Sequence, residues 1–89
     1  MRLAASELVI LDLLSGRGAC YGLELVAASR KRLTRGGIYV TLGRMEEKGL
    51  VTSQPVEADR RRYEATALGL RALVANRLLE GDLPLGARA

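Results

Sequence analysis

The sequence contains no histidine, tryptophan or phenylalanine, and its only cysteine is Cys20. Without histidine there is no imidazole base for catalysis near neutral pH, and a single cysteine makes no metal-binding cluster. We therefore expect no enzyme, no catalytic residues, no metal and no cofactor. A single cysteine also excludes an internal disulfide, which favours a reducing compartment. Cys20 is expected to be a small core or loop thiol, with a redox sensor as the alternative.

Long apolar segments are missing as well. No run in the sequence approaches the roughly 20 apolar residues of a membrane span. The N-terminus has no apolar run behind a basic segment, as a signal peptide would have. The sequence therefore predicts a cytoplasmic protein with no membrane partner.

The 89 residues suffice for one small domain with a single core, since 48% of them are hydrophobic. Tyr21, Tyr39 and Tyr63 are the only aromatic residues, so the core must consist mainly of Leu, Val, Ile and Ala. Such a core has little spare stability, and a second chain is expected to supply further buried surface.

The net charge of +4 is concentrated in the middle of the chain. Between Arg30 and Arg62 there are nine basic and four acidic residues, so this stretch carries +5 and the remainder −1. Such asymmetry favours a polyanion as the partner. The alternative is a solvated charged face in a protein biased toward arginine, because 12 of the 14 basic residues are arginine.

The stretch 34–49 is expected to form one helix with both ends marked. The Thr34 hydroxyl can cap its first turn, and Gly49 can adopt the left-handed conformation that closes a helix. Ile38, Leu42 and Met45 recur at the spacing of one apolar stripe. The opposite side carries Arg35, Tyr39, Thr41, Arg44 and Lys48. A helix with a buried stripe and a basic front is a candidate for contact with nucleic acid.

A second helix is expected before it, from about Tyr21 to Lys31. The cluster Arg30-Lys31-Arg32 crowds its C-terminal end, where cations complement the helix dipole. Contact with DNA is an equal alternative for this cluster. Two short helices joined by a tight connection, the second with a basic face, predict a helix-turn-helix.

Two strands are expected after Gly49, because the apolar period changes from 3.6 to 2. The first covers 50–54 and is ended by Pro55, and the second covers 61–65. Residues 56–60 are expected to form the turn, which is too long for a two-residue hairpin loop. Three helices followed by a basic hairpin and a last helix predict an α+β winged helix-turn-helix.

The first helix, capped by Ser6, and the last helix, from Thr66 to about Glu80 with Gly81 at its end, are apolar on more than one face. A lone domain of this size does not need that much apolar surface, so we expect a two-fold homodimer. The expected interface residues are Leu8, Ile10, Leu13, Leu70, Val74 and Leu78. The domain would span 1–81, with dimerisation helix 66–81, and 82–89 would be a flexible tail.

The segment 33–50, LTRGGIYVTLGRMEEKGL, resembles the third helix of PadR-type winged-helix transcriptional regulators. The positions that match the family pattern are Leu33, Gly36, Tyr39, Leu42, Arg44, Glu46, Gly49 and Leu50. Segments 21–24, 60–63 and 66–69 resemble the start of its second helix, its basic wing strand and the start of its last helix. The resemblance implies the compact branch of the family, in which one C-terminal helix serves dimerisation. Gly37 and Val40 depart from the pattern, which affects which bases are read.

The resemblance implies a transcriptional regulator, in particular a repressor, that binds double-stranded DNA at a palindromic operator. Two third helices would enter major grooves about 34 Å apart, and the wing arginines a minor groove. The candidate DNA-binding residues are Thr34, Arg35, Gly36, Gly37, Tyr39, Val40, Thr41, Arg44, Lys48, Arg60, Arg61 and Arg62. Because strand residues alternate, Arg61 is expected to point away from Arg60 and Arg62.

Several of these assignments have alternatives. Arg35 is the first choice for a base or phosphate contact, against a solubilising role. Gly36 and Gly37 either let the backbone approach phosphate or form a tight connection. Tyr39 either donates to phosphate or packs on the wing, and the cations later in the helix are either phosphate contacts or solvated.

The whole chain also has an alternative function, a winged helix used for protein–protein contact or regulated by a partner. Some members of the family bind flat aromatic compounds. Because Trp and Phe are absent here, we expect either no small effector or a non-aromatic one.

Overall fold

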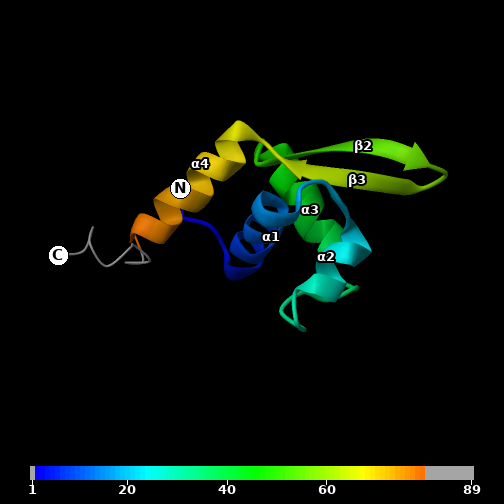
Figure 1. Ribbon diagram of the computed structural model, residues 1–89, viewed down its shortest axis with the longest axis horizontal. Helices are drawn as coiled ribbons and strands as arrows, with labels where there is room; N and C mark the ends of the chain where they lie inside the picture. The colour runs from blue at the N-terminus through cyan, green and yellow to red at the C-terminus, as the bar shows by residue number, and fades with distance from the viewer. Residues whose placement is uncertain (1, 80–89) are drawn as a thin grey trace.

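The computed structural model describes residues 2–79, and within them the fold is α+β. Four helices accompany a three-stranded antiparallel sheet of order β1-β3-β2. The elements are α1 (Ala5–Arg17), β1 (Cys20–Tyr21), α2 (Gly22–Ala28), α3 (Ile38–Glu47), β2 (Val51–Glu57), β3 (Arg60–Ala65) and α4 (Ala67–Leu79). In Figure 1 the first three helices lie together, the β2–β3 hairpin extends to one side and α4 to the other. The predicted winged helix-turn-helix is confirmed.

The core lies between the first three helices and the inner face of the sheet. Ile38, Leu42 and Met45 are buried, which confirms the apolar stripe predicted for the third helix. Ile10 of α1 is also fully buried, with 0% of its surface exposed. Its assignment to a dimer interface is therefore wrong, because its side chain packs in the core of its own chain. Tyr63 adds an aromatic ring to a core that is otherwise mostly aliphatic.

The hairpin differs from its prediction in length and turn. β2 continues through Pro55 to Glu57, and only residues 58–59 form the turn. Proline is tolerated because β2 is an edge strand, where a missing N–H costs no ladder hydrogen bond. Ala58 takes φ 45°, the left-handed conformation that a tight turn requires. The short strand β1, which pairs Cys20 with Tyr63, was not predicted.

The predicted start of the first helix and the predicted end of the second are wrong. Ser6 does not cap α1, since the N-cap is Ala4, whose N–H donates to the Glu7 carboxylate at 2.8 Å. The second helix ends at Ala28 rather than Lys31. There the Ser29 hydroxyl donates to the Val26 carbonyl and accepts the Leu33 N–H. These local bonds turn the chain out of the helix, and Arg30 and Lys31 follow with positive φ.

The third helix begins at Ile38, later than predicted, but its C-terminal end is as expected. Gly49 has φ 78°, its N–H donates to the Glu46 carbonyl, and the Leu50 N–H donates to the Met45 carbonyl. This pair of bonds is the Schellman motif, which needs a left-handed residue at the position of Gly49. The prediction that Gly49 closes the helix is confirmed.

Thr66 joins the last helix to the end of the third. Its hydroxyl oxygen accepts the Gly69 N–H at 3.0 Å, as predicted for a cap, and donates to the Gly49 carbonyl at 2.6 Å. A Cβ on Gly69 would lie 2.1 Å from the Leu50 carbonyl oxygen, so only glycine allows this approach. The predicted helix end at Glu80 and Gly81 and the predicted tail 82–89 lie outside the described residues.

The outer surface of α4 is apolar. Leu70, Val74 and Leu78, spaced by four residues, are 40%, 54% and 52% exposed. Leu8 and Leu13 of α1 are partly buried against the core. No helix within residues 2–79 is long and apolar enough to cross a membrane.

Candidate nucleic-acid interface

The outward face of α3 contains fewer charges than the sequence suggested. Its helical period places Val40, Gly43, Arg44 and Glu47 opposite the buried stripe, and all four are exposed. Within residues 2–79, the Arg44 side chain makes no hydrogen bond or ion pair. Gly43 and Glu47 were not among the predicted site residues, although the same period would have placed them there.

The turn before α3 presents the first group of predicted residues. Thr34, Arg35 and Gly36 are exposed, and in the described part of the chain Arg35 has no side-chain partner. The Gly37 N–H donates to the Thr34 hydroxyl at 3.1 Å, so it is not free for phosphate as had been expected. The Gly36 N–H makes no hydrogen bond with any residue from 2 to 79.

One flank of α3 faces the wing, the hairpin formed by β2 and β3. The Ser53 hydroxyl donates to the Glu46 carboxylate at 2.7 Å and accepts the Arg61 Nε–H at 2.9 Å. Arg61 therefore lies on the inner face of the hairpin, the same side as buried Tyr63. Burial and the nearby Glu46 carboxylate raise the pKa of Tyr63 above 10.0, although Arg61 opposes the rise.

The other two wing arginines lie on the opposite face of β3, as the strand alternation predicted. There they meet Tyr21, whose strand position pairs with Arg62. The Arg60 Cζ lies 3.8 Å from the centroid of the Tyr21 ring, and the Arg62 Nη2 lies 3.3 Å from the Tyr21 hydroxyl. Sequence reasoning missed Tyr21 as a site residue, because its contact depends on the two-residue strand β1.

A hollow of about 150 Å³ separates the wing tip from the start of α3. It is lined by Tyr21, Leu23, Tyr39, Asp59, Arg60 and Arg61. Tyr39 is 53% exposed, and its ring lies so close to Gly22 that a Cβ there would be 2.7 Å from Cε1. The Tyr39 side chain thus packs over the start of α2, and its hydroxyl makes no hydrogen bond with any described residue.

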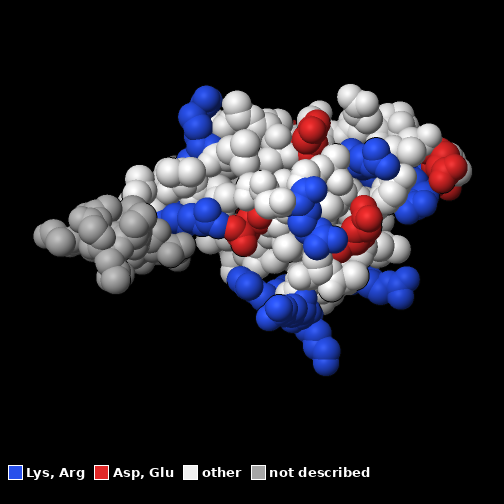
Figure 2. Space-filling model, in the orientation of Figure 1, with Lys and Arg blue, Asp and Glu red and all other residues white. Residues whose placement is uncertain are grey.

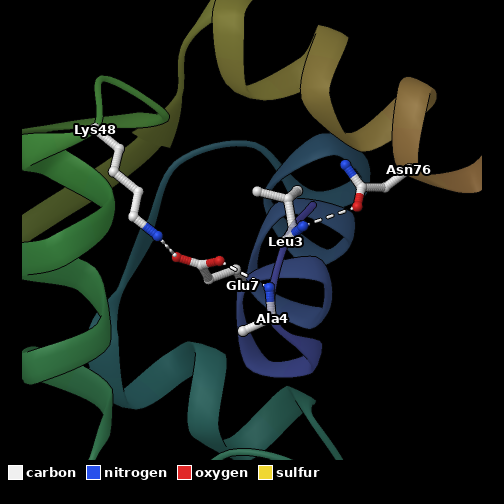
Figure 3. Close-up of polar contacts among 5 residues, drawn as sticks. All are labelled: Leu3, Ala4, Glu7, Lys48 and Asn76. Atoms are coloured by element: carbon white, nitrogen blue, oxygen red, sulfur yellow. Dashed lines mark hydrogen bonds and ion pairs between the residues drawn. The ribbon is translucent and has the colours of Figure 1, made fainter. Parts of the chain in front are cut away.

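The other flank of α3 faces α1, where Lys48 and Thr41 are engaged within the protein. The Lys48 ammonium donates to the Glu7 carboxylate at 2.7 Å, and Glu7 also accepts the Ala4 N–H (Figure 3). The Leu3 N–H donates to Asn76 of α4, so this N-terminal segment contacts both α3 and α4. The Thr41 hydroxyl donates to the Gly37 carbonyl.

Glu7 is nearly buried, with 5% of its surface exposed. Burial raises its pKa, but hydrogen bonds from Lys48 and the Ala4 N–H, with the charges of Lys48 and Arg44, outweigh that effect. The pKa of Glu7 therefore lies below its usual value of 4.5. Its carboxylate is held in the ionised form.

Basic side chains gather around the connection between α2 and α3. Figure 2 shows Lys and Arg along the edge formed by the connection between α2 and α3, with carboxylates nearer the centre and at the wing tip. A groove of about 380 Å³ lies next to that connection, and it contains Arg30, Arg32 and the ion-paired Arg77 and Asp12. Apolar side chains from α1 and α4, including Leu8 and Leu73, form the rest of its lining. No group of His, Cys, Asp or Glu within residues 2–79 has the arrangement of a metal site.

Known proteins resemble this chain in sequence and fold. The sequence profile of the transcriptional regulator PadR-like family matches residues 10–75. The structure of RosR from H. salinarum is 29% identical with a TM-score of 0.73, covering 88% of this chain and 74% of RosR. A PadR-like transcription factor from B. fragilis is 21% identical with a TM-score of 0.74, covering 86% and 81% of the two chains.

A further structural neighbour is BpsR of Bordetella bronchiseptica. It is 23% identical with a TM-score of 0.74, covering 91% of this chain and 61% of BpsR. At identities of 21% and 23%, the last two structures show a shared fold only. No curated protein matches the chain.

Proposed function

The chain belongs to the transcriptional regulator PadR-like family, which makes it a DNA-binding transcription regulator and not an enzyme, and from that premise we propose its specific action. Two copies form a homodimer and repress transcription by binding a palindromic operator. The two α3 helices enter successive major grooves, about 34 Å apart, and each wing follows the neighbouring minor groove.

The observation that carries the proposal is the set of cations without internal partners around the start and front of α3. Arg35 and Arg44 are exposed, and within residues 2–79 neither side chain is bonded to the protein. Arg35 lies in the turn just before α3, at the end that would enter the groove first, where it reaches base edges or phosphate. Arg44 lies further along α3, on its outward face, where it binds phosphate and positions the helix. The free Gly36 N–H offers a further donor to phosphate.

The remaining predicted residues contribute less. Val40 offers an apolar contact of the kind that recognises a thymine methyl group. Tyr39 and Thr34 present their hydroxyls to the DNA at the groove edge. Gly37 has no side chain, so the backbone there can approach the DNA closely. Thr41 and Lys48 lie on the flank toward α1, where both side chains are bonded within the protein, so we assign neither a DNA contact.

The apolar surface of α4 supports the dimer. Leu70, Val74 and Leu78 form one exposed stripe along the helix. Leu8 and Leu13 of α1, partly buried, line the groove between α1 and α4. A monomer would leave this stripe in water. Replacing Val74 with Asp is expected to give monomers in analytical ultracentrifugation. Val56, 45% exposed against 54% for Val74 but on the wing, provides the matched control, since Val56→Asp should leave the dimer intact.

The experiment that tests DNA binding is a salt titration. A fluorescent duplex from the region upstream of the protein's own gene is titrated by anisotropy at rising KCl. The logarithm of the binding constant should fall with that of the salt concentration by about 0.9 for each phosphate neutralised. A flat response, or no binding at low salt, overturns the proposal and leaves the protein-contact function. Selection from a random DNA pool should return a two-fold symmetric site.

BpsR is described as a protein whose DNA binding is regulated by 6-hydroxynicotinic acid. Among residues 2–79, no aromatic side chain lines the groove between α1, α4 and the α2–α3 connection. We propose that no flat aromatic effector controls this regulator. Adding 6-hydroxynicotinic acid should leave both its melting temperature and its DNA affinity unchanged, and a clear rise in melting temperature would contradict this.

A further inference from the structure

Two wing arginines converge on one tyrosine ring. The Cζ atoms of Arg60 and Arg62 lie 3.8 Å and 5.1 Å from the centroid of Tyr21. Arg62 also donates to the Tyr21 hydroxyl at 3.3 Å. The contact follows from the sheet, because β1 pairs Tyr21 directly with Arg62, and Arg60 lies two residues away on the same face.

This arrangement brings two like charges together. Among residues 2–79, Arg60 forms an ion pair with Glu57 at 3.7 Å, and both of those side chains are largely in water. Such a pair offsets little repulsion. In the described part of the chain, Arg62 has no ion pair at all. The negative face of the tyrosine ring, rather than a shared carboxylate, holds the two cations together.

Stacking leaves the binding groups of arginine available. A guanidinium that lies over a ring uses its flat face, while its N–H donors point outward along its edges. Those donors match phosphate oxygens. A free arginine on a hairpin loses rotamer freedom when it binds, whereas an arginine held against a ring has already lost part of it.

We propose that Tyr21 is a positioning residue for DNA binding, which holds Arg60 and Arg62 on the outer face of the wing in the conformation that meets the DNA backbone. This inference rests on the proposed DNA-binding function. Arg61, bonded to Ser53 on the inner face, takes no part in it.

The first test concerns the protein without DNA. Ring-current shifts should move the δ-proton NMR resonances of Arg60 upfield, and Tyr21→Leu should abolish that shift. Arg61, which has no ring contact among residues 2–79, serves as the internal control. An Arg60 resonance at its ordinary position in the wild-type protein overturns the proposal.

The second test is a double-mutant cycle on DNA affinity, using the selected operator duplex. Tyr21→Leu should weaken binding by about fivefold and lower the salt slope by about one. Tyr21→Phe keeps the ring and should retain most of the affinity. In the background Arg60→Ala with Arg62→Ala, Tyr21→Leu should have no further effect, because there is nothing left to position.

The outcomes separate the alternatives. Equal losses in both backgrounds would mean that Tyr21 only supports the fold, and an unchanged affinity would mean that it does nothing for DNA; either result overturns the proposal. If Tyr21→Leu does not fold, Tyr21→Phe is carried through the same cycle, where loss of the hydroxyl bond should cost affinity only when Arg62 is present. A shifted Arg60 resonance in a wild-type protein that binds no DNA would reject the proposed function, and with it this role of Tyr21.

Discussion

A basic residue stands at each end of α3, Arg35 just before its start and Lys48 at its end, but the protein uses the two differently. At the C-terminal end, Lys48 binds Glu7 of α1 and Glu46 binds Ser53 of β2. The Schellman motif at Gly49 and the hydroxyl of Thr66 fix the same end to α4. At the N-terminal end, Arg35 is exposed and has no partner in the described part of the chain.

This difference separates the end of α3 that supports the fold from the end that is proposed to recognise DNA. The C-terminal end of α3 is bound to α1, the wing and the proposed dimer helix, so its position relative to the second subunit is fixed. The N-terminal end is left free to contact DNA. A basic residue on this helix is therefore informative only when its partners within the protein are known. The substitutions that follow test the difference, from the largest expected effect to the smallest.

Gly69→Ala is the most direct test of how the C-terminal end of α3 is held against α4. The added Cβ would meet the Leu50 carbonyl at 2.1 Å, and backbone cannot yield as a side chain would. We expect a loss of about 3 kcal/mol in unfolding free energy, at the upper end of the cost of overpacking. Gly16→Ala is the matched control, because a Cβ there meets nothing within 4 Å. Equal stability of both variants in urea denaturation would show that α4 is not held where we describe it.

Lys48→Met should also reduce stability. It keeps the length of the side chain but leaves the nearly buried Glu7 carboxylate with only the Ala4 N–H as a close donor. Because Lys48 is itself 45% exposed, we expect a loss of about 2 kcal/mol rather than the full cost of breaking a buried pair. The slope of DNA affinity against salt should stay nearly unchanged. A large fall in that slope with unchanged stability would restore Lys48 as a DNA contact.

Arg35→Ala should have the opposite effects to Lys48→Met, with unchanged stability and weaker DNA binding. The side chain is exposed and makes no hydrogen bond or ion pair within residues 2–79, so the melting temperature should stay the same. DNA affinity should fall about tenfold, equivalent to roughly 1.4 kcal/mol, as for one base or phosphate contact. If the two variants Lys48→Met and Arg35→Ala behaved alike in both measurements, the distinction between the two ends of α3 would fail.

Much of this arrangement followed from the sequence, and the exceptions have physical causes. The helical period of 3.6 residues predicted the buried stripe of α3. The strand period of 2 residues predicted that Arg61 points away from its neighbours Arg60 and Arg62. Gly49 and Thr66 marked helix ends because their bonds are local. The strand β1 was missed because two residues become a strand only by pairing with β3.

The charged residues were the hardest to assign. Lys48 and Arg44 are four residues apart on one helix and look equivalent in sequence. Only Lys48 forms a hydrogen bond with Glu7, which lies 41 residues before it in the chain, and this contact gives the two residues different roles. Arg30 and Lys31 likewise adopt positive φ without any glycine to mark the turn. Such contacts depend on tertiary structure, which composition and period do not encode.

Acid should weaken the supported end without any substitution. The pKa of Glu7 is lower in the folded protein than its usual 4.5, so the folded state binds fewer protons there than the unfolded state. The stability it contributes is present above pH 4.5 and is lost as the pH falls through the folded-state value. Glu7→Gln cannot titrate, so its melting temperature should fall less steeply over the same pH range. Parallel curves for the two proteins would contradict the ion pair.

Ser53→Ala should have the smallest effect. Ser53 bridges Glu46 of α3 and Arg61 of the wing, but both of those side chains are exposed and water can replace the hydroxyl. We expect a loss of about 0.5 kcal/mol in stability, within the range of exposed polar contacts. Because Arg61 would then be free, the salt slope should stay constant or rise slightly. A fall in DNA affinity comparable to that of Arg35→Ala would mean that the bridge sets the angle between wing and helix, and that the wing flank of α3 belongs with its recognition end.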